Sequence, residues 1–112
     1  MQFSPLLPLT MTASGAVTAE RFITSAGAQI TVAGTAAIGV SRNTAASAAQ
    51  VVVDTVGTAI IEAGGAITAG AAVKAGADGR ALAYDTGTKA GIALQAATAA
   101  GQRIEIFVLS AA

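Results

Sequence analysis

The sequence predicts an all-β fold, a small compact barrel or sandwich of short strands. Short runs of β-branched and aliphatic residues alternate with glycine-containing turns along the chain. The alanine-rich residues 43–49 have some helical propensity, but a helix this short is marginal, so we expect a loop there, with a single helical turn as the alternative. The two halves of the chain also echo each other, as expected if two similar β units pack their apolar faces together.

The composition indicates one domain with a thin core. A chain of 112 residues is long enough for a single domain. Apolar residues make up 54% of the chain and aromatic residues only 4%, and roughly a quarter of all residues are alanine, well above typical usage. Because alanine buries little surface, we expect the domain to gain stability from a partner or from oligomerisation.

The charged and reactive residues exclude several functions. Six basic and six acidic residues cancel, which argues against nucleic-acid binding. The chain has no Cys and no His, so it lacks thiolate ligands, the commonest general base and the commonest metal ligand. The long uncharged run of residues 22–40 is too polar for a membrane span, and residues 1–19 lack the basic start of a secretory signal. We therefore expect a soluble protein that binds no cofactor, metal, nucleic acid or membrane.

Residues 1–12 are expected to form an extended arm, followed by a single β domain over residues 13–112. Pro5 and Pro8 fix the backbone φ and block a helix. The arm is too apolar for a free tail, so it either covers an edge of its own domain or reaches onto a neighbouring subunit. Its candidate interaction residues are Phe3, Pro5, Leu6, Leu7, Pro8 and Leu9.

In the first half of the chain, we expect strands at residues 21–24, 29–32, 37–40 and 50–53. Phe22 is the anchor of the first strand, and the valines of residues 51–53 are expected to be buried on both faces. Val56 and Gly57 are expected to form a turn, after which residues 58–62 return as the second arm of a hairpin.

In the second half, residues 64–81 are expected to form a strand, a turn, a strand, a turn and a third strand. Gly70 and the Asp78-Gly79 pair sit where the backbone needs a positive φ. Further strands are expected at residues 80–84, 90–95 and 103–109. In the last strand, alternation places Ile104, Ile106 and Val108 on one face. The other face is expected to be exposed to solvent at the start of the strand, at Arg103 and Glu105, and covered toward its end, at Phe107 and Leu109.

An internal repeat relates the two halves at an offset of about 50 residues. Gly15-Ala16-Val17-Thr18-Ala19 matches Gly65-Ala66-Ile67-Thr68-Ala69. Residues 39–41, with the alanine-rich link to residues 50–53, match residues 91–94 with the link to residues 102–104. Two units are too few for a solenoid, so a compact barrel or sandwich is expected.

No set of residues carries the pattern of a catalytic or ligand site. The glycine-rich residues 64–79 lack the Gly-Lys-Ser/Thr and helix of a phosphate loop, and Asp78-Gly79 lacks the recurring acidic ligands of a Ca²⁺ loop. Asp54 and Glu62 could face each other across the expected hairpin, but solvated strand faces are the favoured interpretation. We therefore predict that the protein is not an enzyme.

Four arginines are the most plausible surface contact residues, because the planar guanidinium makes bidentate hydrogen bonds at interfaces. Each of them taken singly is more often an ordinary surface residue. They are Arg21, Arg42, Arg80 and Arg103.

Several motifs follow one another in an order that resembles the capsid decoration (cement, head-stabilising) proteins of tailed bacteriophages, long filed as a domain of unknown function. The resemblance covers residues 21–109. The motifs are Arg21-Phe22-Ile23-Thr24, Ala37-Ile38-Gly39-Val40, Gly57-Thr58-Ala59, Ala63-Gly64-Gly65-Ala66-Ile67-Thr68-Ala69-Gly70 with Val73, Asp78-Gly79-Arg80-Ala81, Gly91-Ile92-Ala93-Leu94 and Ala99-Ala100-Gly101.

The resemblance implies a non-enzymatic β domain that binds the outer capsid surface of the virion and locks neighbouring major capsid proteins together. It also implies a homodimer or homotrimer, made in the cytoplasm of a bacterial host. The alternative is a carbohydrate-binding or adhesin-type β module. With one Tyr, three Phe and no Trp, the chain offers few aromatic platforms for sugars, so this alternative ranks lower.

Overall fold

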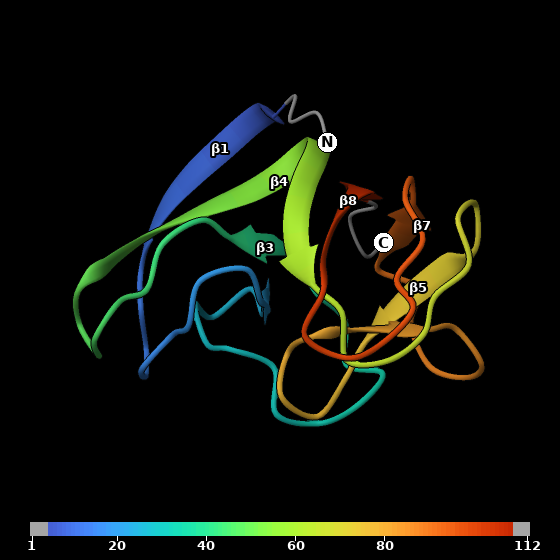
Figure 1. Ribbon diagram of the computed structural model, residues 1–112. Helices are drawn as coiled ribbons and strands as arrows, with labels where there is room; N and C mark the ends of the chain where they lie inside the picture. The colour runs from blue at the N-terminus through green and yellow to red at the C-terminus, as the bar shows by residue number, and fades with distance from the viewer. Residues whose placement is uncertain (1–4, 109–112) are drawn as a thin grey trace.

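Eight antiparallel strands form one sheet that curls into a nearly closed barrel-like shape (Figure 1). The computed structural model describes residues 5–108, with side chains from residue 9 onward. No helix occurs within residues 5–108, and the predicted all-β class is confirmed. The strands are β1 (Pro5–Thr12), β2 (Phe22–Ile23), β3 (Gly39–Ser41), β4 (Gln50–Glu62), β5 (Ala72–Ala75), β6 (Ala81–Ala83), β7 (Gly91–Ala93) and β8 (Arg103–Val108).

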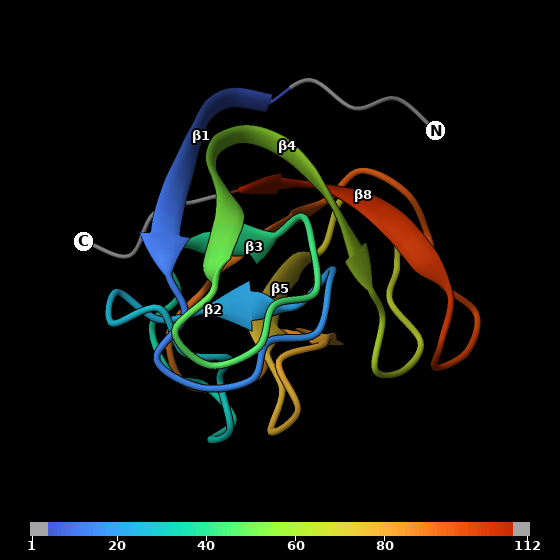
Figure 2. The same ribbon diagram turned by 90° about the vertical axis from the view of Figure 1, so that its left-hand side faces the viewer.

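Strand β4 connects the two halves of the sheet. The strand order is β2-β3-β4-β8-β7-β5-β6, and β1 also pairs with β4. The first half of β4 pairs with β1 and β3, and its second half pairs with β8. Figure 2 shows the strong bend of this strand between the two sets of partners.

The predicted turn at Val56 and Gly57 is wrong, because β4 runs through both residues. Gly57 has a φ of 97° and pairs with Pro5 on one side and Val108 on the other. Its left-handed backbone, which glycine adopts at little cost, therefore accompanies a bend in a continuous strand and not a reversal of the chain.

The predictions at residues 21–24, 80–84, 90–95 and 103–109 hold with shorter bounds, the strand at residues 37–40 is shifted to Gly39–Ser41, and residues 50–53 and 58–62 both belong to β4. In residues 64–81 the second and third predicted strands are β5 and β6, but the first is wrong, because Ile67 forms only an isolated bridge, to Ala97. Residues 29–32 form no strand either. There only Gln29 forms an isolated bridge, to Ile23, since the chain turns at Val32 where the Thr35 amide donates to its carbonyl. Residues 43–49 form a loop, as expected. Gly70 and Gly79 have φ of 85° and 80°, which confirms the two predicted left-handed positions. Residue 109 of the last predicted strand lies outside the described residues.

The two halves are structural repeats, residues 5–56 (the first unit) and residues 57–108 (the second unit). Strands β1, β2, β3 and the first half of β4 correspond to the second half of β4, β5, β7 and β8. Ile23 pairs with Gly39 in the first unit as Val73 pairs with Gly91 in the second. The sequence matches at residues 15–19 and 65–69 reflect this repeat.

The loops of the two units repeat as well. Val17 and Ala45 exchange two backbone hydrogen bonds of 2.8 and 2.9 Å, and Ile67 and Ala97 exchange two of 2.9 Å. Each pair ties the loop after the first strand of its unit to the loop before the last strand. The repeat therefore includes the connections as well as the strands.

Two buried clusters divide the interior. The first-unit core contains only residues of the first unit, and the main core combines both units. Strand β2 separates them, because Ile23 points into the first-unit core and Phe22 into the main core. The first-unit core consists of Ala13, Val17, Ile23, Ala45, Val51 and Val53. The first unit contributes Phe22, Ile30, Ala37 and Val40 to the main core.

Candidate protein-interaction surfaces

The described part of the predicted arm, Pro5–Thr12, is strand β1 and pairs with β4 of the same chain. Leu9 lies opposite Val53 with 44% of its surface exposed, and the neighbouring Met11 packs against the first-unit core. Residues 1–4, with the candidate Phe3, lie outside the described residues. So do the side chains of residues 5–8. The interaction role of the arm thus remains a prediction.

The four arginines selected from the sequence all form ion pairs within the chain. Arg21 Nη2 lies 3.3 Å from Glu62 Oε1, and Arg42 Nη2 lies 2.5 Å from Asp54 Oδ1. Arg80 lies 3.1 Å from Glu62 and 2.6 Å from Asp78, and Arg103 pairs with Glu20. None of these partners was identified from the sequence.

Three of these arginines line the boundary between the two units in what we call the charged seam: Glu20, Arg21, Glu62, Asp78, Arg80 and Arg103. Glu62 accepts hydrogen bonds from Arg21 of the first unit and Arg80 of the second. The Asp78 carbonyl accepts from the Arg21 guanidinium at 3.1 Å and from the Gln29 amide at 2.8 Å. The charged seam therefore holds the two units in one relative orientation.

The pairing of Arg80 with its acidic neighbours shifts pKa values within the charged seam. Partial burial alone would raise the pKa of Asp78, but hydrogen bonds from the Arg80 side chain and backbone outweigh it and lower that pKa. The same pairing raises the pKa of Arg80, through hydrogen bonds to Asp78 and Glu62. Both groups are therefore charged over the whole physiological range.

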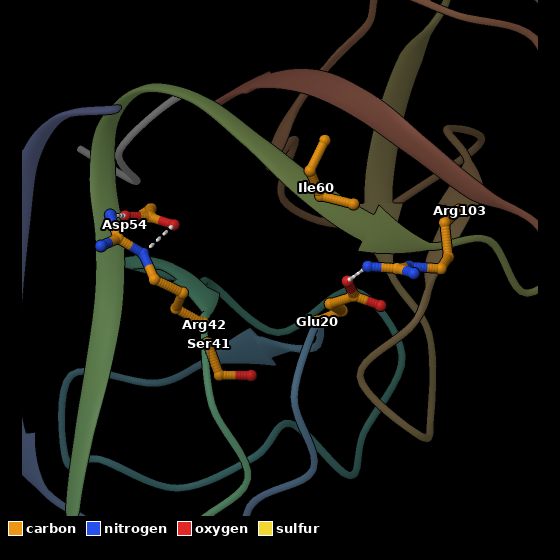
Figure 3. Close-up of a pocket in the computed structure, with 6 residues that line it drawn as sticks. All are labelled: Glu20, Ser41, Arg42, Asp54, Ile60 and Arg103. Atoms are coloured by element: carbon orange, nitrogen blue, oxygen red, sulfur yellow. Dashed lines mark hydrogen bonds and ion pairs between the residues drawn. The ribbon is translucent and has the colours of Figure 1, made fainter. Parts of the chain in front are cut away.

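A pocket of about 230 Å³ opens between the units (Figure 3). Its carboxylates are Glu20, which pairs with Arg103, and Asp54, which pairs with Arg42 (Figure 3). Because each carboxylate is neutralised by a neighbouring guanidinium, the pocket presents two ion pairs and no uncompensated acid or base. The lining residues are Glu20, Ser41, Arg42, Asp54, Ile60 and Arg103.

Asp54 and Glu62, which could have faced each other across the predicted hairpin, do not form a pair of carboxylates. Asp54 and Glu62 lie on the same strand, β4, opposite Val40 and Arg103 respectively. The expected solvated face is wrong for Asp54, which is 2% exposed and stable there because Arg42 pairs with it. No trio of acidic residues within residues 5–108 could hold a metal ion, and no helix within that range could span a membrane.

An exposed apolar face, missed by the sequence reasoning, lies on β7 and β8. Ile92 pairs directly with Phe107, and the exposed fractions of Ile92, Leu94 and Phe107 are 37%, 47% and 42%. The prediction for this face of β8 is confirmed at Arg103, which is exposed, and is wrong at Glu105 and Phe107. Glu105 is buried, and its backbone amide donates a hydrogen bond to the Gln95 side chain, whereas Phe107 is exposed.

Comparison with known proteins adds independent findings. The family model described as phage cement protein matches residues 1–108. A crystal structure of the head fiber gp8.5 N base of bacteriophage phi29 matches with a TM-score of 0.73 and 23% sequence identity, over 92% of this chain and 93% of that chain. At this identity the second likeness concerns the fold alone. No curated protein matches the sequence.

Proposed function

The chain belongs to the phage cement protein family, and on this basis we propose that it binds the outer surface of a phage head and stabilises the contacts between neighbouring major capsid proteins. Membership of this family makes it a structural protein of the phage particle. The proposal adds the outer surface as its location, the major capsid protein as its partner and a role without catalysis.

The observation that carries the proposal is the family match over residues 1–108. The internal structure supports it. The charged groups of the seam and the pocket are paired within the chain, which suits a rigid spacer better than a reactive site. A thin core gains stability from any partner that binds only the folded form, and many copies on one shell add their contacts by avidity.

We assign the capsid contact first to residues 1–8 of the arm, with Phe3, Pro5, Leu6, Leu7 and Pro8. Among the described strands, β1 pairs only with β4, and an open strand edge is a common surface for pairing with another chain. Of the arginines, Arg103 and Arg42 have side chains 60% and 41% exposed. They are therefore better placed for a partner than Arg21, at 16%.

The carbohydrate-binding alternative gains no support from the aromatic residues. Phe22 is buried, and Lys89 lies over the Tyr84 ring, with its Nζ 5.2 Å from the ring centre. Among the described aromatic side chains this leaves Phe107 exposed. A single exposed ring is a weak platform for sugar stacking.

The test uses expanded heads of the parent phage that lack this protein. We expect the purified full chain to co-sediment with the heads to saturation and to raise their disruption temperature in calorimetry. A variant lacking residues 1–8 should bind at least tenfold more weakly, while the matched surface variant Val32→Ala binds as the wild type does. Failure of the full chain to bind the heads, or binding without a rise in disruption temperature, would overturn the proposal.

A further inference from the structure

The two units contact each other head to tail inside the chain. On the outer face of the first unit, Phe22 pairs with Val40, and both are buried, at 0% and 1% exposed, in the main core. The same cluster contains Ile61 and Ile106 from the inner face of the second unit. The outer face of one unit thus covers the inner face of the next.

The corresponding outer face of the second unit is only partly covered: Ala72 is half-buried, and Ile92, Leu94 and Phe107 are exposed. The paired positions Phe22 and Val40 correspond to Ala72 and Ile92, which pair in the same register. On the next strand, Val40 pairs with Asp54 in the first unit, and Ile92 pairs with Phe107 in the second. Leu94 takes the position of Arg42, so the Arg42–Asp54 ion pair is replaced by two exposed apolar side chains.

The inner face of the first unit is open at the matching places. Leu9 pairs with Val53, and Ala59 pairs with the equivalent residue of the second unit, Ile106, so Leu9 corresponds to Ala59. Leu9 is 44% exposed, whereas Ala59 is 0% exposed. Met11 corresponds in the same way to Ile61, and it is half-buried where Ile61 is fully buried. We call Leu9, Met11 and the half-buried Ile38 the open rim.

We propose that a second copy of this chain docks on the first so that the apolar face of one molecule (Ala72, Ile92, Leu94, Phe107) covers the open rim of the next. The docking repeats between molecules the contact that already joins the two units within one molecule. Each molecule then uses two different surfaces, so the association is heterologous and produces a ring if the rotation closes. A symmetric dimer through one shared surface is excluded by this arrangement.

The apolar face and the open rim are chemically complementary. Exposing a phenylalanine flanked by two aliphatic side chains to water is unfavourable, and contiguous apolar surface is a common feature of protein interfaces. The open rim is also apolar, and it lies over the first-unit core, against which Met11 and Ile38 pack. Both surfaces lose their exposure in a single contact.

The first experiment measures self-association of the isolated protein, with no phage heads present. Sedimentation velocity should show a concentration-dependent oligomer for the wild type. Phe107→Asp should weaken the association at least tenfold because it places a charge in the contact. Val32→Asp, a change at a 66% exposed residue outside both surfaces, should leave it unchanged. A monomeric wild type, or an oligomer unaffected by Phe107→Asp, would overturn the inference.

The second experiment tests the head-to-tail geometry. The chain has no cysteine, so Leu9→Cys and Ile92→Cys can be made as single variants and mixed with a short thiol-specific bismaleimide. We expect crosslinks between the two variants and none within either variant alone. Crosslinking of Leu9→Cys with itself, or of Ile92→Cys with itself, at equal yield would show a symmetric interface and overturn the inference. Neither experiment involves capsid binding, so each proposal can fail separately.

Discussion

Ala48 and Gly101 occupy equivalent turn positions in the two units, and both have a left-handed backbone, with φ of 69° and 91°. The Ala48 amide donates to the Ala13 carbonyl and the Gly101 amide to the Ala63 carbonyl, each at 2.8 Å. The repeat therefore extends to a turn whose backbone suits glycine, and the first unit carries alanine there.

The first prediction follows from the strain at Ala48. A left-handed backbone costs a non-glycine residue about 1 kcal/mol, part of which is offset because glycine loses more entropy on folding. Ala48→Gly should therefore raise the free energy of unfolding by up to about 1 kcal/mol. The reciprocal change, Gly101→Ala, should lower it by about 1 kcal/mol, since no atom lies within 4 Å of the added Cβ and the penalty is conformational. Urea unfolding would measure both; a destabilising Ala48→Gly would contradict the equivalence.

A second prediction concerns two buried glycines that the repeat also relates. A Cβ on Gly39 would collide with the Asp54 carbonyl oxygen, and one on Gly91 would collide with the Phe107 carbonyl oxygen. Both Gly39→Ala and Gly91→Ala should lower the free energy of unfolding by about 1–3 kcal/mol, as overpacking does. Gly15→Ala is the control, because nothing lies within 4 Å of its Cβ. Equal midpoints for the three variants would rule out this close strand approach.

Features that depend on local rules were predictable from the sequence. Period-two alternation correctly placed Ile104 and Ile106 on the buried face of β8, and the need for positive φ correctly identified Gly70 and Gly79. Gly57 shows the limit of such rules. A valine followed by glycine gives the same local signal for a turn and for a bend in a strand, and the pairing of Gly57 with Pro5 and Val108 depends on residues distant in the sequence.

The candidate surfaces were less predictable because their partners are far apart in the chain. Arg21 and Glu62 are separated by 41 positions, and Arg103 and Glu20 by 83. No spacing rule relates such residues. The exposure of Phe107 has a similar origin, since it depends on which face of the second unit is left uncovered after the two units pack. Only the repeat, detected in the sequence at residues 15–19 and 65–69, could have indicated this.

A third prediction tests the packing between units. Phe22 is fully buried in the main core, and a buried phenylalanine replaced by alanine typically costs about 3–5 kcal/mol. Phe22→Ala should therefore remove much of the stability of a domain whose total is about 5–15 kcal/mol. Calorimetry should show a large fall in Tm for Phe22→Ala. The exposed control Val32→Ala should change the free energy of unfolding by no more than about 0.5 kcal/mol and so leave Tm nearly unchanged. Similar Tm values for the two variants would contradict a shared core.

The last prediction is a pH dependence of stability. Hydrogen bonds from Arg80 outweigh the opposing effect of burial and lower the pKa of Asp78 below its usual 3.8. Those from Lys74 and the Thr86 amide lower the pKa of Asp85. A carboxyl group with a lowered folded-state pKa stabilises the fold above its unfolded-state pKa, and this contribution is lost as the pH falls through the folded-state value. The free energy of unfolding should therefore fall as the pH is lowered below about 4.

Arg80→Gln isolates the share of Asp78 in this effect. Without the guanidinium, the folded-state pKa of Asp78 moves back toward its unfolded value, so the acid-induced loss should become shallower because fewer protons are taken up on unfolding. Lys89→Gln, which removes an exposed cation outside the charged seam, should keep the wild-type slope. Urea unfolding between about pH 5 and pH 2 would measure the three slopes. An Arg80→Gln slope equal to that of the wild type would show that the pairing of Arg80 with Asp78 does not contribute to acid sensitivity.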